Sequence, residues 1–201
     1  MSKGQVFIIS GPSGSGKDTL LQLLFEAHPE IKFSISSVTR PMREGEVEGG
    51  KYNFVSREKF LSMIKNDELL EHNEFVGNFY GTPRKPVEAA VDGGFDIIVE
   101  IDVNGAEQIR KKIPDAISIF IMPPSLEVLK KRLSGRGTET AELVEKRLAA
   151  SLGEIARAEE YDYIVVNDVL EEAVNDVAAI ICSERLRLCR QYPLINEILN
   201  K

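Results

Sequence analysis

The sequence predicts an α/β fold in which helices cover both faces of a doubly wound parallel sheet. Short apolar segments recur along the chain, each followed by a stretch with helical periodicity, as is typical of parallel strands buried on both faces. A glycine-rich loop between the first segment and the first helix indicates a sheet of the P-loop NTPase type. The apolar segments are Val6–Ile9, Ile97–Ile101, Ile117–Ile121 and Tyr163–Val166.

The rest of the core follows from the same alternation. A chain of 201 residues is most simply one domain with insertions, and we expect its core over residues 4–36 and 84–190. The expected helices are Thr19–Glu26, Asn104–Lys112, Leu126–Leu133 and Glu171–Arg190, with one further short strand at Phe33–Ser36.

Residues 37–83 interrupt this pattern and predict a small mixed α/β insertion. Lys51–Val55 and Leu69–Val76 alternate in hydrophobicity as strands do, and Arg57–Asn66 between them has a helical pattern. A second irregular stretch, about residues 134–147, places glycines around an arginine, a composition expected of a mobile lid. The sequence indicates no role for the tail, 191–201.

Composition excludes several classes of protein. The net charge is −7, whereas extended nucleic-acid binding needs a basic face. The apolar runs are too short to cross a membrane, and the N-terminus lacks the pattern of a signal peptide. Cys182 and Cys189 are expected as reduced thiols on one face of a helix. We therefore expect a cytoplasmic protein without nucleic-acid or membrane partners; monomer and homodimer stay open.

The glycine-rich loop has the features of a phosphate site. Gly11, Gly14 and Gly16 allow a tight turn that aims several N–H groups at one volume, while Lys17 and the following helix N-terminus add positive charge. A chance glycine-rich turn is the alternative, but it does not explain why strand, loop, lysine and helix fall in this order. The pattern predicts a site for a nucleoside triphosphate.

One position departs from the usual loop pattern. Ser or Thr normally follows the lysine and reaches Mg²⁺, but here Asp18 follows and Thr19 comes next. A carboxylate beside phosphates would repel them unless it points away or reaches Mg²⁺. We expect Asp18 to point away and the Thr19 hydroxyl to serve near the phosphates instead.

A second candidate site lies in the insertion. Arg40 and Arg43 are three residues apart, hydroxyl groups precede them and Tyr52 follows, a set that can hold one phosphate dianion. The alternative is a solvated turn in which these arginines pair with the glutamates at 44, 46 and 48. Composition alone does not decide between the two.

Six motifs in order give the chain a family resemblance. They are G-P-S-G-S-G-K at 11–17, T-R-P-M-R-E-G-E at 39–46, Y-N-F-V at 52–55, N-F-Y-G-T at 78–82, E-I-D-V-N-G at 100–105 and K-K-R-L-S-G-R-G-T-E-T at 130–140. From Gln5 to about Arg185 the chain resembles guanylate kinases, which transfer a phosphoryl group from ATP to GMP. Asp18 and Val38 depart from the residues usual there.

The resemblance implies roles for the matching residues, and makes 37–83 a GMP-binding insertion. The implied ATP-binding residues are Gly11, Pro12, Ser13, Gly14, Ser15, Gly16, Lys17, Asp18, Thr19, Arg132, Arg136 and Asn167. The implied GMP-binding residues are Ser36, Arg40, Arg43, Tyr52, Glu71, Tyr80, Thr82, Glu100, Asp102 and Arg147. The implied catalytic residues are Lys17, Arg43, Arg136 and Arg147. Mg²⁺ would bind with ATP through Thr19, the phosphates and water near Glu100.

The carboxylates are where alternatives remain. Glu71 can accept from guanine N1–H and the N2 amine together, although by itself it would be interpreted as a solvated strand residue. Glu100 and Asp102 follow a strand at the end where parallel sheets bind ligands, but Asp102 can equally be a helix N-cap. The sequence does not decide which of the two serves metal-bound water and which serves guanine.

Two other functions are open to such a chain. One is that of a non-catalytic, protein-binding relative of guanylate kinases, which typically lacks a working phosphate loop. The other is that of a kinase for another nucleoside monophosphate, which differs only in the base pocket. Whether dGMP is accepted stays open.

Overall fold

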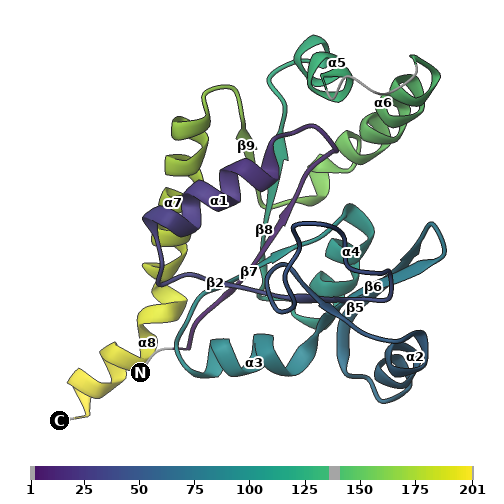
Figure 1. The fold of residues 1–201 in the computed structure, drawn as a ribbon. Helices are drawn as coiled ribbons and strands as arrows, with labels where there is room; N and C mark the ends of the chain where they lie inside the picture. Colours follow the sequence, from purple (N-terminus) through teal and green to yellow (C-terminus); the bar gives the residue numbers. More distant parts are fainter. Residues whose placement is uncertain (1–2, 136–140, 201) are drawn as a thin grey trace. The chain divides into compact units, whose positions relative to one another are not determined.

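Two sheets organise the structure. The computed structural model describes residues 3–135 and 141–200 (Figure 1). A five-stranded sheet has the strand order β2-β7-β1-β8-β9, and a four-stranded sheet has the order β4-β3-β6-β5. In the first sheet β1 and β2 each pair in parallel with β7, and β8 pairs in parallel with β9. The parallel α/β fold expected from the sequence is confirmed.

The described chain separates into two compact units. One comprises Lys3–Ser10 and Glu30–Ser118, and the other comprises Gly11–Pro29 and the described residues from Ile119 onward. The strands are β1 (Val6–Ser10), β2 (Lys32–Phe33), β3 (Ser36–Val38), β4 (Tyr52–Phe54), β5 (Leu69–Phe75), β6 (Asn78–Pro83), β7 (Ile97–Glu100), β8 (Ile117–Met122) and β9 (Tyr163–Val166). The helices are α1 (Lys17–Ala27), α2 (Arg57–Lys65), α3 (Arg84–Asp92), α4 (Val103–Lys112), α5 (Leu126–Ser134), α6 (Ala141–Ile155), the 3₁₀ turn η1 (Ala158–Glu160), α7 (Leu170–Arg185) and α8 (Leu188–Leu199).

Apolar residues of β1 and β7 form the core of the first unit. Phe7, Ile8 and Ile98 have no exposed surface, and Val6 pairs with Ile97 in the ladder. Burial of such side chains stabilises a fold by roughly 1.5–3 kcal/mol each, which explains why these segments form strands with apolar residues on both faces.

The four-stranded sheet lies within the same unit and has its own apolar cluster, formed by Phe60, Met63 and Leu69. β5 and β6 form a hairpin whose turn residues, Val76 and Gly77, both have positive φ, as a tight hairpin turn requires. β5 is the edge strand of this sheet. One side of its backbone is therefore not paired with another strand.

Helix packing organises the second unit. α1 lies beside α7 (Figure 1), and α5 meets α6 through Leu129, Leu133 and Val144.

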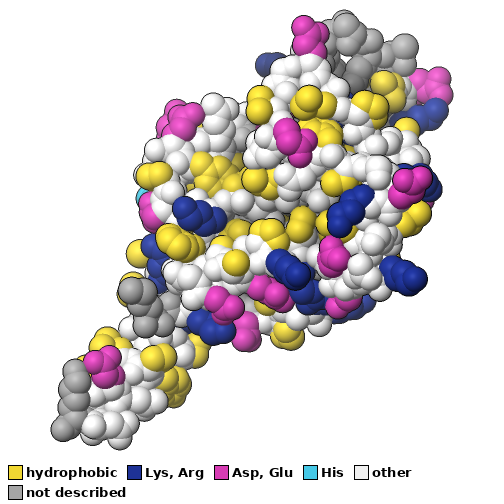
Figure 2. Space-filling view, turned by 60° about the horizontal axis from the view of Figure 1, so that its bottom comes forward, with side chains coloured by type: hydrophobic (Ala, Val, Ile, Leu, Met, Phe, Trp, Pro, Cys, Tyr) yellow, Lys and Arg dark blue, Asp and Glu magenta, His cyan; other side chains and the backbone are white. Residues whose placement is uncertain are grey.

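The chain ends in α8, whose apolar side chains are exposed along the arm at the lower left of Figure 2. Among the described helices, none combines the length and apolar character needed to cross a membrane.

Several expected elements are wrong in detail. The strand expected at Phe33–Ser36 is two strands in different sheets, since β2 ends at Phe33 and β3 begins at Ser36. β6 and α3 have no counterpart in the prediction. The helix expected to reach Arg190 ends at Arg185, so Cys182 lies in α7 and Cys189 in α8; both thiols are free and exposed.

Candidate active site

The glycine-rich loop in the second unit is a compact turn that only small residues can form. Gly14 and Gly16 have φ of +85° and +83°, a region that costs other residues energy. A Cβ at Gly11 would lie 2.4 Å from the carbonyl oxygen of Ile121. The Ser15 N–H donates to the Pro12 carbonyl over 3.0 Å and closes the turn before α1 begins.

Two side chains hold the Ser15 carbonyl. The Asn167 amide nitrogen donates to it over 2.8 Å, and Nη1 of Arg132 donates over 3.3 Å. Nη2 of Arg132 also donates to the Asn167 carbonyl over 3.0 Å. A carbonyl oxygen turned toward an anion would repel it, so these donors favour a loop whose N–H groups serve the ligand.

Other predicted site residues lie around the same loop, among them Arg147, which the resemblance assigned to GMP binding and catalysis and not to ATP. Nη2 of Arg147, on α6, donates to the Ser13 hydroxyl over 2.7 Å. Lys17 is the first residue of α1, and Asp18 and Thr19 are exposed in its first turn. Arg136 lies outside the described residues. The structure thus places Arg132, Arg147 and Asn167 at the loop.

In the first unit, Arg40 is buried and already paired. Its Nη1 and Nη2 each lie 2.6 Å from an oxygen of Glu46, and Nη1 donates to the Pro41 carbonyl over 3.0 Å. The ring of Tyr52 lies 5.1 Å from the guanidinium carbon. Hydrogen bonding to Arg40 lowers the pKa of Glu46 to about 2, and the same pairing raises the pKa of Arg40. Pairing with a nearby glutamate, the alternative left open by the sequence, is therefore present at Arg40.

Strand pairing brings the expected phosphate residues together. Ser36 on β3 pairs with Tyr52 on β4, and Val38 pairs with Tyr80 on β6. The two tyrosine rings meet edge to face with centroids 6.2 Å apart. Burial raises the pKa of Tyr52, so its hydroxyl keeps its proton at neutral pH. The exposed Arg43 follows Arg40 on the loop after β3, and its backbone N–H donates to Glu46 over 2.8 Å.

Glu71 is a buried acid on β5. Only 5% of its surface is exposed, and the hydroxyl of Thr82, its partner in the β5–β6 ladder, donates to Oε1 over 2.7 Å. Burial, against the hydrogen bond from Thr82, raises the pKa of Glu71 to about 7. Gly105 leaves room for this carboxylate, because a Cβ there would lie 2.9 Å from Oε2.

Asp102 and Glu100 have different partners. Oδ1 of Asp102 accepts from the N–H groups of Asn104 and Gly105 over 3.0 and 2.8 Å, and so caps α4. Oδ2 accepts from the Asn73 amide over 3.0 Å. Glu100 ends β7, and its Oε2 lies 2.9 Å from Nζ of Lys51. The N-cap alternative thus holds for one oxygen of Asp102.

Some side chains that hold these groups are missing from the sequence prediction. Lys51 and Asn73 give no local signal, because their partners lie far along the chain. Gln108 and Lys112, which contact β5 from α4, are four residues apart on one side of the helix. That spacing, next to the motif at 100–105, was the only signal that could have singled them out.

A phosphate-binding loop before a helix, together with a separate cluster of arginines, tyrosines and buried acid, defines a P-loop nucleotide kinase. Comparisons with known proteins agree. A family model described as guanylate kinase matches residues 3–184. The guanylate kinase of Carboxydothermus hydrogenoformans is 46% identical over 93% of this chain and 92% of the relative, and that of Neisseria gonorrhoeae is 45% identical over 98% and 96%.

A solved structure is also similar. The crystal structure of guanylate kinase from Anaplasma phagocytophilum matches with a TM-score of 0.78 and 36% identity, covering 98% of this chain and 96% of that one. The chain belongs to the guanylate kinase family, whose reaction is the transfer of the γ-phosphoryl group of ATP to GMP, giving ADP and GDP.

Proposed function

We propose that this chain carries out that transfer with GMP bound at the four-stranded sheet and α4, and with ATP bound on the loop between β1 and α1. The observation that carries the proposal is the buried carboxylate of Glu71, hydrogen-bonded to Thr82 on the adjacent strand. Membership of the family supports both substrates.

Glu71 is the proposed reader of guanine. Guanine offers N1–H and the N2 amine side by side, and one ionised carboxylate can accept from both. Adenine has an acceptor at N1, which would face the carboxylate without a proton between them. Sites built on such bonds can reject an analogue by ~10⁴-fold or more, because buried polar groups lose their partners. Thr82 and Asp102 are assigned to the same base.

The GMP phosphate is assigned to Ser36, Arg40, Arg43, Tyr52 and Tyr80. An arginine has five N–H donors. Three of those on Arg40 donate to Pro41 and Glu46, and a hydrogen bond joins Arg40 to Tyr80. Glu46 therefore occupies one edge of the guanidinium and orients it, while donor capacity remains for a phosphate oxygen.

The ATP phosphates are assigned to the loop N–H groups and Lys17, with positive charge added by Arg132, Arg136 and Arg147; Asn167 is assigned to the adenine side. The phosphoryl acceptor is an ionised phosphate oxygen, so no side chain has to remove a proton. These residues act by alignment and charge neutralisation.

Mg²⁺ is the proposed metal. This ion usually binds through one or two protein groups, with substrate phosphates and water completing its coordination. The exposed Thr19 hydroxyl at the start of α1 fits such a role. When bound, the ion would neutralise charge on the phosphates.

Substrate preference tests the proposal. Glu71→Gln replaces one acceptor oxygen with an amine, which opposes guanine N1–H and can donate to adenine N1. The kcat/KM for GMP should fall and the preference for GMP over AMP should narrow, with the KM for ATP unchanged. Glu74→Gln, on the exposed part of the same strand, is the matched control. An unchanged preference in Glu71→Gln would mean that guanine is read elsewhere.

A cytoplasmic location is proposed because both substrates are small cellular nucleotides. Detection of the protein in the membrane fraction after cell fractionation would contradict it.

A further inference from the structure

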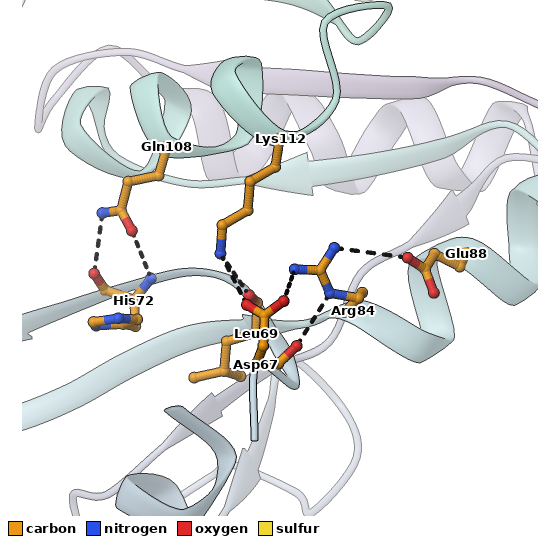
Figure 3. A network of polar contacts seen from close by, with 7 residues as sticks. All are labelled: Asp67, Leu69, His72, Arg84, Glu88, Gln108 and Lys112. Carbon is orange, nitrogen blue, oxygen red and sulfur yellow. Dashed lines mark hydrogen bonds and ion pairs between the residues drawn. The ribbon is translucent and has the colours of Figure 1, made fainter. Parts of the chain in front are cut away.

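Side chains of α4 bind the outer edge of β5 on both sides of Glu71. Gln108 makes two hydrogen bonds to the backbone of His72, the residue after Glu71 (Figure 3). The His72 N–H donates to Oε1 of Gln108 over 3.2 Å, and Nε2 of Gln108 donates to the His72 carbonyl over 3.1 Å. The side-chain amide therefore supplies the hydrogen-bond donor and acceptor that the backbone of a neighbouring strand would supply at this edge.

Lys112 holds the strand on the other side of Glu71. Its ammonium group donates to the Leu69 carbonyl over 2.9 Å and lies 3.7 Å from Oδ1 of Asp67 (Figure 3). Asp67 has a φ of +52°, and Nη2 of Arg84 lies 2.9 Å from its Oδ2. The start of β5 is thus fixed by charged groups from two elements.

Gly105 is the third residue of α4 that lies against β5. Residues 105, 108 and 112 follow one another at helical spacing, so they share one side of α4. Gln108 and Lys112 bind the β5 backbone, while Gly105 faces the Glu71 carboxylate, where a Cβ would approach to 2.9 Å. The β5–β6 register also shifts between Leu69 and Glu71. An irregular strand has less ladder pairing to fix its position, so it depends more on bonds from outside the sheet.

We propose that Gln108 is a positioning residue for base recognition: by fixing the His72 backbone it sets where the Glu71 carboxylate lies. The inference rests on the proposed role of Glu71 in reading guanine. Gln108 itself touches the strand and not the base. Since the two N–H groups of guanine require both carboxylate oxygens in one plane, a small shift of β5 weakens recognition of GMP more than that of IMP, which lacks the N2 amine.

The test compares Gln108→Ala with Lys111→Ala. Lys111 is exposed on the same helix and pairs only with Glu107 in the bonds described. Gln108→Ala should raise the KM for GMP and lower kcat/KM by ~10-fold, below the ~100-fold that a misplacement of about 1 Å can cost. The GMP-to-IMP and GMP-to-AMP preferences should both narrow, the KM for ATP should not change, and Lys111→Ala should match wild type.

A double variant separates positioning from simple stabilisation. If Gln108 acts through Glu71, Gln108→Ala should change neither preference ratio further in a Glu71→Gln background. If Gln108→Ala narrows the preference ratios in the Glu71→Gln background as much as it does in wild type, the inference is overturned. Gln108→Met, which keeps the length but not the hydrogen bonds, should reproduce the effect and replaces the alanine variant if the latter does not fold.

The outcomes also distinguish this inference from the proposed function. If Glu71→Gln leaves the GMP-to-AMP preference unchanged, the role of Glu71 is wrong, and the inference falls with it. If Glu71→Gln narrows the preference while folded Gln108→Ala and Gln108→Met keep the wild-type ratios, only the role of Gln108 is wrong.

Discussion

Arg40 and Glu46 form a two-pronged ion pair, in which each terminal nitrogen of the guanidinium lies 2.6 Å from one carboxylate oxygen. Such fork-to-fork pairing fixes the plane of an arginine as well as its charge. The same glutamate accepts from the backbone N–H of Arg43 over 2.8 Å. One acid therefore organises both arginines assigned to the GMP phosphate.

Removal of Glu46 should impair GMP binding. In Glu46→Ala, Arg40 loses its orienting partner, and we expect the KM for GMP to rise by ~10-fold, with the KM for ATP unchanged. Glu44→Ala removes an exposed acid of the same loop and is the control. A lower KM for GMP in Glu46→Ala would show instead that Glu46 competes with the phosphate for Arg40.

The raised pKa of Glu71 predicts a pH dependence of stability. Its pKa is about 7 in the folded protein, against an ordinary 4.5. Between these two values the folded state binds more protons than the unfolded state, so the Glu71 contribution to the free energy of unfolding decreases as pH rises. Denaturant unfolding from pH 4 to 8 should show this decrease in wild type. The free energy of unfolding of Glu71→Gln should depend less on pH over the same range.

The same titration should govern GMP use. Only the ionised carboxylate can accept from both guanine N–H groups, so kcat/KM for GMP should rise as pH increases through about 7 in wild type. The GMP phosphate itself titrates at about pH 6. Glu71→Gln keeps that substrate titration and should lose the rest of the pH dependence. Identical pH profiles for the two enzymes would contradict the assignment.

Asp18 and Thr19 should contribute unequally to turnover. Both are exposed in the first turn of α1, but only the neutral Thr19 hydroxyl can lie beside the ATP phosphates without electrostatic repulsion. Asp18→Ser should keep turnover near wild type, whereas Thr19→Val, which loses the hydroxyl, should lower kcat by ~10-fold or more. The comparison is made by steady-state kinetics at saturating Mg²⁺. The reverse ranking would assign the role to Asp18.

Gly16→Ala should destabilise the phosphate loop by more than the energy of placing alanine in a left-handed backbone conformation. Its φ is +83°, and an added Cβ would lie 2.5 Å from the Asn167 amide nitrogen, which holds the Ser15 carbonyl. Gly77 also has positive φ, but a Cβ there meets nothing within 4 Å. Gly77→Ala should therefore cost only about 1–2 kcal/mol of stability for the left-handed backbone.

Calorimetry with and without ATP distinguishes the two glycines. Gly16→Ala should lose more stability than Gly77→Ala and should also bind ATP more weakly. If both variants lose the same stability and Gly16→Ala keeps the wild-type affinity for ATP, the contact between Asn167 and the loop is not needed for stability or for ATP binding.

The parallel core and the phosphate loop could be predicted from the sequence, because both follow from local patterns. Tyr163–Val166 forms β9 with the expected bounds, since aromatic and branched residues favour an extended strand. Its side chains are not all buried, because β9 is an edge strand in which Val165 is buried while Ile164 and Val166 are exposed. The turn at 11–16 follows from glycines that no other residue could replace there. Local patterns were less informative for β6, where glycine and proline at 81 and 83 indicate a turn.

The surroundings and partners of the predicted site residues depend on the tertiary structure. The sequence placed Glu71 in a strand, but burial beside Thr82 and Gly105 makes it an acid with a pKa near neutrality. It likewise left the partner of Arg40 open until the loop brought Glu46 to it. Gln108 has no signal of its own, because its role depends on which strand edge meets α4. Pairing and burial depend on contacts between distant segments, and local sequence patterns do not specify these.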